Sequence, residues 1–243
     1  MFAPITIVVS RNVYMSIKAN CIVKSNPETR SVLLACHMLL AWLFPGLVQA
    51  AQSSESITYE RRIEAVTSTP QSRQKAIAEG KNAAFFCVNC HGETGLGRFD
   101  NVPNLAGQNP AYLMVQIQKF ADGRRKDDFM SGLIKALSEA DRLNMAVYYA
   151  SLTAPANTPK DKRAADRGRT HYSRACVGCH GADAHGNRDI ARLAGQKASY
   201  VMESLQKYRD RRGARTDPVM SSVASGLNNA QIEDLSAYLS SLP

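Results

Sequence analysis

The sequence predicts an all-α protein that consists of two tandem domains, and three observations support this prediction. The pentapeptide C-x-x-C-H occurs twice, at residues 87–91 and 176–180. The similarity continues downstream, where CHGETGLGRFDNVPNLAGQ (Cys90–Gln108) aligns with CHGADAHGNRDIARLAGQ (Cys179–Gln196). Both halves contain apolar residues at helical spacing, and neither contains a convincing alternating strand. The two motifs start 89 residues apart, too far for a solenoid repeat, so the pattern indicates duplication of a small domain.

The first fifty residues have the features of an export signal. Residues 1–30 carry four basic side chains and one acidic one, residues 31–47 carry no charge, and a small residue, Ala50, follows. We therefore expect residues 1–50 to be a signal peptide cleaved after Ala50, with Met15 as a second candidate start of translation. The alternative is an uncleaved membrane anchor, because the apolar run is close to the minimum length of a membrane-spanning helix.

The remainder of the chain divides into four segments. Residues 51–70 are polar and lack a clear periodicity, so we expect a loose N-terminal tail. Residues 71–153 and 160–243 are the two predicted domains. Between them, residues 154–159 belong to the sequence TAPANTP, whose prolines and small side chains predict a short linker.

Each predicted domain contains about four short helices. In the first, good helix formers occupy residues 72–86 and lead into the first motif. A cap and a proline at Asn109-Pro110 precede a helix over residues 111–121. Ser138 starts the last helix, with an acidic residue three positions later. The corresponding helices of the second domain are residues 162–175, residues 198–209 and the segment capped by Asn228 or Asn229.

The C-x-x-C-H motif is the attachment sequence of c-type haem. Its two thiols can each add to one vinyl group of the same porphyrin, and the following histidine can bind the iron. We therefore predict two covalently bound haem c groups, one per domain, each completing a polypeptide core that would be marginal alone. The residues concerned are Cys87, Cys90, Cys176 and Cys179 for attachment and His91 and His180 for the iron. The other two cysteines, Cys21 and Cys36, fall in the predicted signal peptide, so none of the six remains for a structural disulfide.

The second axial position of each iron needs another ligand, and methionines are candidates. Met130 and Met220 recur in the two halves, lie between predicted helices and are each followed by serine, so we predict these two as the axial ligands. Met114 and Met202 also recur but lie in the middle of a predicted helix, where core packing is the better interpretation. The remaining candidates occur in one half each and are Met145, His171 and His185.

The chain carries a formal net charge of +9. Residues 51–159 hold 12 Lys and Arg against 11 Asp and Glu, whereas residues 160–243 hold 14 against 9. A basic surface suits an acidic protein partner or peripheral contact with an anionic membrane, and a solvated charge excess explains it equally well. No feature indicates binding of nucleic acid. Basic residues also precede each candidate methionine, where we expect solvated loops; the alternatives are pairing with haem propionates or docking of an acidic partner near the haem edge. These residues are Arg124-Arg125-Lys126 and Arg209, Arg211, Arg212 and Arg215.

Together these motifs resemble those of class I cytochromes c, and the duplicated set is similar to that of the two-haem cytochrome c4 family. The resemblance rests on C-x-x-C-H-G and L-A-G-Q in both halves with Met-Ser downstream, and it extends over residues 76–242. It implies two tandem cytochrome c-like domains, each a small helical fold around a covalently bound haem, packed about a pseudo-twofold axis. It also implies a periplasmic electron carrier without catalytic residues, which takes electrons from a bc-type complex toward a terminal oxidase.

The two halves differ at a position where the family has a proline whose carbonyl orients the proximal histidine. Pro103 fits this position before the first L-A-G-Q segment, whereas the second half has Ala191. The alanine carbonyl can still accept the hydrogen bond, but its loop is less constrained. We therefore expect the second haem to have a differently tuned site.

Three other functions share parts of this pattern. A cytochrome subunit of a periplasmic dehydrogenase would have the same haem chemistry and would differ in its partner. A dihaem peroxidase would need an open iron position, which a candidate methionine in both halves disfavours. A metal site built from the two C-x-x-C pairs is disfavoured by their separation and by the histidine next to each pair.

Overall fold

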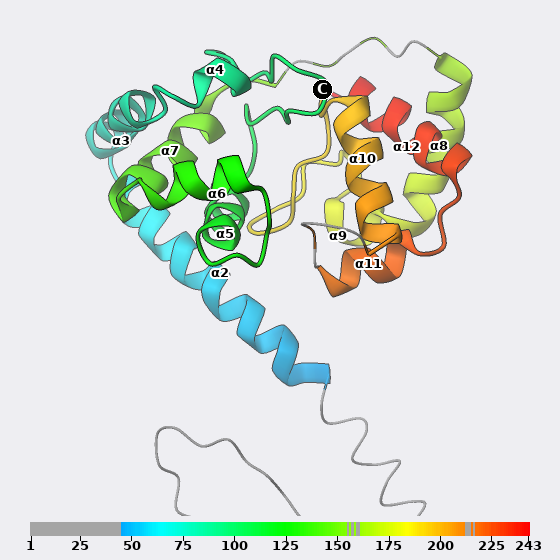
Figure 1. The fold of residues 1–243 in the computed structure, drawn as a ribbon, viewed down its shortest axis with the longest axis horizontal. Helices are drawn as coiled ribbons and strands as arrows, with labels where there is room; N and C mark the ends of the chain where they lie inside the picture. Colours follow the sequence, from blue (N-terminus) through cyan, green and yellow to red (C-terminus); the bar gives the residue numbers. More distant parts are fainter. Residues whose placement is uncertain (1–44, 155, 157, 159–160, 212–214, 216) are drawn as a thin grey trace, which may run out of the picture. The chain divides into compact units, whose positions relative to one another are not determined.

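The computed structural model describes residues 45–243, with gaps at residues 155, 157, 159–160, 212–214 and 216 (Figure 1). Most of the predicted signal peptide, residues 1–44, lies outside the described residues. Within the described part of the chain, no helix is both long enough and apolar enough to cross a membrane.

Helices make up the regular structure of the described residues, which confirms the all-α prediction (Figure 1). The first helix is α2 (Pro45–Thr67). The first half continues with α3 (Pro70–Ala83), α4 (Val88–His91), α5 (Pro110–Ala121), α6 (Asp128–Lys135) and α7 (Glu139–Ser151). The second half repeats this order with α8 (Lys162–Ala175), α9 (Val177–His180), α10 (Ala198–Arg209), α11 (Pro218–Ala224) and α12 (Asn229–Ser241). Each of α3–α7 therefore has a counterpart in α8–α12.

Side-chain caps explain where the last helix of each half begins. The Ser138 side chain accepts a hydrogen bond from the Asp141 N–H at the start of α7. Asn228 caps α12 and forms a reciprocal capping box with Gln231. Of the two asparagines that the sequence offered, Asn228 is thus the cap, and Asn229 is the first helical residue.

Asn109 does not cap α5 in the way that the sequence predicts. It occupies the N-cap position, but its side chain makes no capping hydrogen bond. Its amide instead donates to the carbonyls of His185 (3.0 Å) and Ile190 (2.7 Å) in the second half. Pro110 begins the helix without this cap, because it has no N–H to satisfy and its φ angle suits the first turn. The polar side chain is therefore used to join the two halves.

Helix α3 packs closely against α7 in the first half, and α8 packs against α12 in the second (Figure 1). A glycine lies at each crossing. A Cβ atom on Gly80 of α3 would lie 2.1 Å from the carbonyl oxygen of Asn144 in α7. A Cβ atom on Gly168 of α8 would lie 2.0 Å from the carbonyl oxygen of Asp234 in α12. These distances are far below van der Waals contact, so both crossings require a residue without a side chain.

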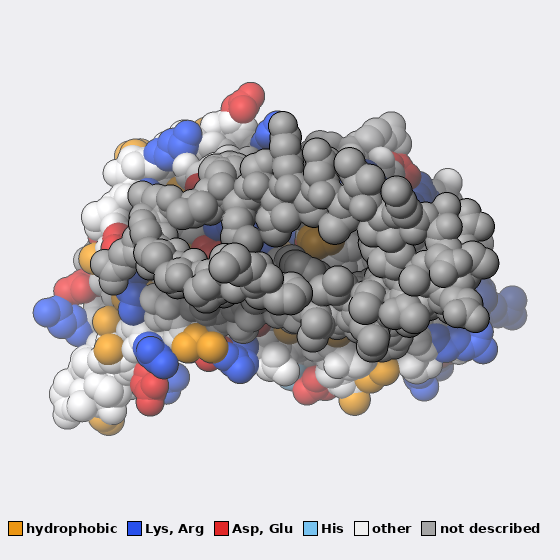
Figure 2. All heavy atoms as spheres, turned by 90° about the horizontal axis from the view of Figure 1, so that it is seen from below, with side chains coloured by type: hydrophobic (Ala, Val, Ile, Leu, Met, Phe, Trp, Pro, Cys, Tyr) orange, Lys and Arg blue, Asp and Glu red, His pale blue; other side chains and the backbone are white. Residues whose placement is uncertain are grey.

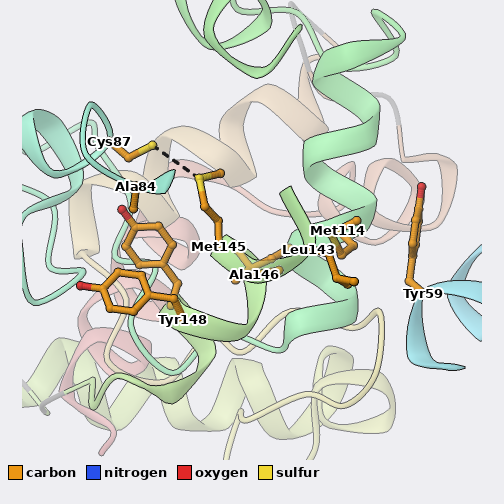
Figure 3. Packing of buried hydrophobic residues seen from close by; sticks show 10 residues of the cluster. Tyr59, Ala84, Cys87, Met114, Leu143, Met145, Ala146 and Tyr148 are labelled. Carbon is orange, nitrogen blue, oxygen red and sulfur yellow. Dashed lines mark hydrogen bonds between the residues drawn. The ribbon is translucent and has the colours of Figure 1, made fainter. Parts of the chain in front are cut away.

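Each half has its own buried core. Figure 3 shows Met114 of α5 and Leu143, Met145 and Tyr148 of α7 in the core of the first half. Met114 is 2% exposed, in agreement with its interpretation as a core residue, whereas its counterpart Met202 is half-buried. The buried residues of the second core are Ala165, Tyr172, Ala184, Ala194, Val201, Leu235, Tyr238 and Leu239.

The expectation of a loose tail over residues 51–70 is wrong, because α2 continues to Thr67. Tyr59 is buried in the first core, and Ile63 and Val66 pack against it. Their spacing of four and three residues places these side chains on one face of a helix. The apolar stripe is short and the residues around it are polar, which is why the pattern is inconspicuous in the sequence.

Ion pairs connect α2 to both halves. Arg62 pairs with Glu139 of α7, and Glu55 pairs with Arg124 at 3.1 Å. On the other side, Glu60 lies 2.5 Å from Arg188 of the second half. Such partly exposed pairs contribute little free energy individually, so the apolar contacts of α2 stabilise its position and the ion pairs orient it.

Alanine at Gly80 or Gly168 should destabilise the protein. The added methyl group would push the paired helices apart, and we expect the free energy of unfolding to fall by about 1–3 kcal/mol. Guanidinium denaturation followed by circular dichroism measures this change. Gly132→Ala in α6 is the matched control, because nothing lies within 4 Å of the position its Cβ would take. An unchanged unfolding midpoint in Gly168→Ala would contradict the close helix crossing.

Candidate functional site

Each C-x-x-C-H pentapeptide folds into a single helical turn that ends at its histidine. In α4 the His91 N–H donates to the Cys87 carbonyl at 2.8 Å, and the same bond measures 3.0 Å in α9. A glycine in the left-handed region terminates each turn, with φ of 73° at Gly92 and 79° at Gly181. The first cysteine and the histidine of each motif are four residues apart and therefore lie on the same face of the turn.

Both motif histidines are oriented by the same hydrogen bond. The Nδ1 atom of His91 lies 3.1 Å from the carbonyl oxygen of Pro103, and that of His180 lies 2.9 Å from the carbonyl oxygen of Ala191. A carbonyl can only accept, so Nδ1 carries the proton and Nε2 has a free lone pair. Burial lowers the pKa of both imidazoles and keeps them neutral, although the carbonyl contacts oppose this effect.

The residues present fit a haem iron on the Nε2 side of both rings. Within the described part of the chain, neither His91 Nε2 nor His180 Nε2 has a hydrogen-bond partner. The donor set at each turn is a neutral imidazole with two thiols in the same short segment, which is the donor set that c-type haem requires. The carbonyl of Ala191 accepts the hydrogen bond that Pro103 accepts in the first half, so the substitution of proline by alanine preserves this contact.

The four motif cysteines differ in burial. Cys87 is buried, Cys90 and Cys176 are half-buried, and Cys179 is exposed. Burial raises the pKa of Cys87 and raises that of Cys176 to about 11, so both remain protonated thiols at neutral pH. The Cys87 sulfur lies 4.0 Å from the sulfur of Met145 (Figure 3). Met145, which has no counterpart in the second half, therefore packs against the attachment site of the first half.

Met130 and Met220 lie in the first turn of short helices, not in the loops that the sequence predicts. Each is the third residue of its helix, α6 or α11. The side chains of Asp127 and Asp217 accept hydrogen bonds from the methionine N–H groups at 2.9 Å and 3.0 Å. Both methionines are half-buried. The two candidate ligands thus share one local structure, a capped helical turn, which repeats in both halves.

Among the described residues, the two histidines outside the motifs have protein partners. His171 lies 3.7 Å from the buried carboxylate of Asp234. His185 lies 3.0 Å from Asp183, and its other ring nitrogen lies 2.9 Å from the carbonyl oxygen of Pro243. These contacts account for both side chains without a role at an iron.

Two arginines, each five residues before a candidate methionine, converge on one tyrosine. Arg125 donates to the Tyr200 hydroxyl at 3.1 Å, and Arg215 donates to the same hydroxyl. Arg125 also lies over the Phe120 ring, with 4.3 Å between the guanidinium carbon and the ring centroid. Arg215 lies 5.5 Å from the Tyr208 ring in the same way. For these two arginines the expectation of solvated loops is wrong.

The convergence of cations has an electrostatic consequence for Tyr200. Burial opposes ionisation of its hydroxyl, but Arg215 and Arg125 lower its pKa to about 8. Among the described residues, neither arginine forms an ion pair with a carboxylate. The two cations therefore create a positive potential inside the molecule where the halves meet, which favours an anionic group.

Gln108 and Gln196 end the two L-A-G-Q segments, and each binds the backbone of the other half. Gln196 accepts from the Asn104 N–H at 2.8 Å and donates to the Asn104 carbonyl at 2.9 Å. Gln108 makes the same two bonds with Arg192, at 2.7 Å and 2.9 Å. We call these two contacts the amide clamps. They relate the halves symmetrically, because Asn104 and Arg192 each directly precede an L-A-G-Q segment.

Sequence reasoning identified the L-A-G-Q repeat but missed the role of its glutamines. The clamp partners are 92 and 84 residues apart in the chain. A pattern search within one half does not connect such distant positions. The available signal was that a polar glutamine ends the L-A-G-Q segment in both halves.

Comparison with known proteins gives a consistent result. The cytochrome c family matches residues 165–243. The chain is 34% identical to cytochrome c4 of Azotobacter vinelandii over 188 residues, which covers 68% of this chain and 88% of the relative. It is also 34% identical to a thiosulfate dehydrogenase electron acceptor of Thiomonas intermedia, covering 65% of this chain and 78% of the relative.

Solved structures show the same likeness. Reduced recombinant cytochrome c4 from Pseudomonas stutzeri superposes with a TM-score of 0.63 at 30% identity, covering 68% of this chain and 97% of that chain. The thiosulfate dehydrogenase TsdBA from Marichromatium purpuratum superposes with a TM-score of 0.59 at 29% identity, covering 69% of this chain and 40% of that chain.

Removal of the aspartate caps should loosen the turns that carry Met130 and Met220. We expect Asp127→Ala and Asp217→Ala each to cost about 1 kcal/mol of local stability, because the methionine N–H loses its acceptor. Faster amide hydrogen exchange at Met130 or Met220 measures the effect. Asp127→Asn and Asp217→Asn are the matched controls, since asparagine also caps helices well. Equal exchange rates in the alanine variants and the parent protein would show that the caps are dispensable.

Proposed function

Because the chain belongs to the cytochrome c4 family, we propose that it is a periplasmic electron carrier that binds two haem c groups, one in each half. Electron transfer is the activity of the family, and covalently bound haem c is its cofactor. Bound haem would supply reversible one-electron chemistry between ferric and ferrous iron. The two haem domains of the proposal are residues 71–153 and 160–243, and export follows from the predicted signal peptide over residues 1–50.

The observation that carries the proposal is the repeated orientation of a buried motif histidine by a backbone carbonyl. In this arrangement Nε2 is free for iron, and the hydrogen bond at Nδ1 raises the basicity of the ligand. Cys87, Cys90 and His91 would hold the first haem with Met130 as the second axial ligand. The second haem would be held by Cys176, Cys179, His180 and Met220. A thioether ligand favours ferrous iron and therefore a relatively high potential.

The chain's own arginines suit the carboxylates that haem would bring. Arg125 and Arg215 lie at equivalent positions and have no carboxylate partner among the described residues. We propose that they stabilise haem propionates, which are the anions that the positive potential between the halves favours. Charge-assisted hydrogen bonds from guanidinium groups are suited to this task because the propionates would be partly shielded from water.

Partner proteins would contact a surface with exposed apolar side chains beside the candidate ligands. Phe129 and Val219 directly precede Met130 and Met220 and are 69% and 48% exposed. In the described part visible in Figure 2, basic side chains lie at several places along the edge of the face. A bc-type complex as donor and a terminal oxidase as acceptor are the partners that we propose.

A second candidate role is electron acceptance from a dehydrogenase. Two relatives are named thiosulfate dehydrogenase electron acceptors, and one structural neighbour is a thiosulfate dehydrogenase. The haem chemistry would be the same in both roles. Co-purification with a catalytic subunit, or reduction by a dehydrogenase and not by a quinol-oxidising complex, distinguishes them.

The purified protein should show the reduced-minus-oxidised visible spectrum of haem c, with two haems per chain that resist extraction by acidic acetone. The pyridine haemochrome assay measures their number, because thioether-linked haem has a characteristic absorption. Cys176→Ala/Cys179→Ala should leave one attached haem. Absence of covalently attached haem from the parent protein would refute the proposed function.

Met130→Ala and Met220→Ala should each remove the weak charge-transfer band of one ferric haem and lower the potential of that haem, because the thioether ligand is lost. Absorption spectroscopy of the oxidised protein and potentiometric titration measure the two effects. Met202→Leu is the matched control, since Met202 also has a counterpart in the other half but lies within α10, away from the two capped turns that carry Met130 and Met220. Retention of the full band in Met220→Ala would assign the second axial position to another residue.

A further inference from the structure

In each half, one peptide group is hydrogen-bonded at both ends. Its carbonyl accepts from the motif histidine, and its N–H donates to the clamp glutamine of the other half. The carbonyl of Ala191 accepts the hydrogen bond from His180, and the N–H of the same peptide group, which belongs to Arg192, donates to Gln108 at 2.7 Å. A peptide group is planar and rigid, so fixing its N–H also fixes the direction of its carbonyl. Gln108 of the first half therefore holds the acceptor of the histidine in the second half.

The reverse connection has the same form. The Pro103 carbonyl accepts from His91, and the N–H of the next residue, Asn104, donates to Gln196 at 2.8 Å. The glutamines are 6% and 7% exposed, so these bonds are shielded from water. Hydrogen bonds in such a chain polarise one another: an N–H that donates makes its own carbonyl a better acceptor.

From this geometry we infer that Gln108 and Gln196 are positioning residues that tune the haem of the opposite half. The inference rests on the proposed function. The series runs from the glutamine oxygen through a peptide group to the proximal imidazole. A stronger acceptor at Nδ1 gives the imidazole more anionic character, which stabilises ferric iron and lowers the potential. Loss of a clamp should therefore raise the potential of the haem in the other half.

The two clamps should not have equal effects. In the first half Pro103 restricts the backbone, and the Asn104 side chain adds bonds to the Gly97 N–H (3.0 Å) and the Gly195 carbonyl (2.9 Å). The second half has Ala191 in place of the proline. The side chain of Arg192 adds one bond, from its guanidinium to the carbonyl of Pro243 at 2.7 Å. The carbonyl that orients His180 therefore depends more on Gln108 than the carbonyl that orients His91 depends on Gln196.

If the glutamines acted only within their own half, each would affect the haem of that half and not the haem of the other. Gln108 also accepts a hydrogen bond from the Asn109 N–H, and Gln196 accepts one from the Lys197 N–H, both at 3.0 Å. If these contacts within each half mattered most, a substitution would disturb the haem of its own half. The identity of the haem that responds therefore separates a crossed effect from a local one.

The test is potentiometric titration of the full-length holoprotein carrying Gln108→Met or Gln196→Met. Methionine keeps the length of the side chain and removes all three hydrogen bonds of each amide. All variants also carry Met130→His, which separates the redox transitions (waves) of the two haems in the titration. Imidazole in place of thioether lowers the potential of the first haem. We expect Gln108→Met to raise the midpoint potential of the second haem and to leave that of the first haem unchanged. Gln196→Met should raise the midpoint potential of the first haem by a smaller amount.

Two further variants keep the test decisive. If Gln108→Met does not fold, Gln108→Asn replaces it. Its side chain keeps the amide but is too short for both clamp hydrogen bonds, so we expect a smaller shift in the potential of the second haem. Ala191→Pro combined with Gln108→Met should reduce the shift, because proline restores the local constraint. Gln118→Met is the control, since the Gln118 amide donates to Asp122 within its own half at 3.5 Å. The midpoint potentials of both haems in Gln118→Met should equal those of the Met130→His background protein.

A readout independent of potential is the exchange of the proximal imidazole proton with water. By NMR of the reduced protein, the His180 Nδ1 proton should exchange faster in Gln108→Met, while the His91 proton keeps its rate. Shifts confined to the haem of the substituted half, or no shift in either wave, would overturn the inference. Absence of covalently bound haem would refute the proposed function instead, so the two failures are distinguishable.

Discussion

The constraint on which the rest of the structure depends is the need of a buried imidazole N–H for an acceptor. A buried polar group without a partner costs free energy, and each half meets this need with a backbone carbonyl from the loop before L-A-G-Q. The acceptor must come from the backbone at a fixed place, so the loop must be held as firmly as the ring. Each half also has a glycine with positive φ directly after the histidine and one close helix crossing, of α3 with α7 or of α8 with α12. In the proposed function such a site needs no catalytic residues, because it holds a redox group in one geometry.

The protein has two copies of this histidine–carbonyl arrangement, and they differ in how far the local sequence restricts the backbone of the carbonyl. Pro103 limits its own backbone, whereas Ala191 does not. Both carbonyls nevertheless lie within hydrogen-bond distance of their histidine. The position of a functional carbonyl can thus be kept by contacts from another domain where the local sequence has lost rigidity. In this sense the interface between the halves belongs to both candidate sites, and the hydrogen bonds that join the halves also shape the surroundings of each imidazole.

Local features of the fold were predictable from the sequence, and long-range ones were not. The starts of α7 and α12 followed from Ser138 and Asn228, because a cap acts within four residues. Helix α2 was missed because Tyr59, Ile63 and Val66 form a stripe too short to stand out among polar neighbours. The clamps and the meeting of Arg125 with Arg215 join positions more than 80 residues apart, which no periodicity within one half contains.

The amide clamps also impose an order in time. The chain emerges N-terminus first, so the first half can form its local helices while the backbone of Asn104 is still hydrated. Gln196 reaches it 92 positions later. The second half has a different history, since Gln108 is already present when Arg192 appears. The copy that lacks the stiffening proline therefore finds its clamp residue already present in the chain when its loop emerges, whereas the loop of the first copy precedes its clamp residue.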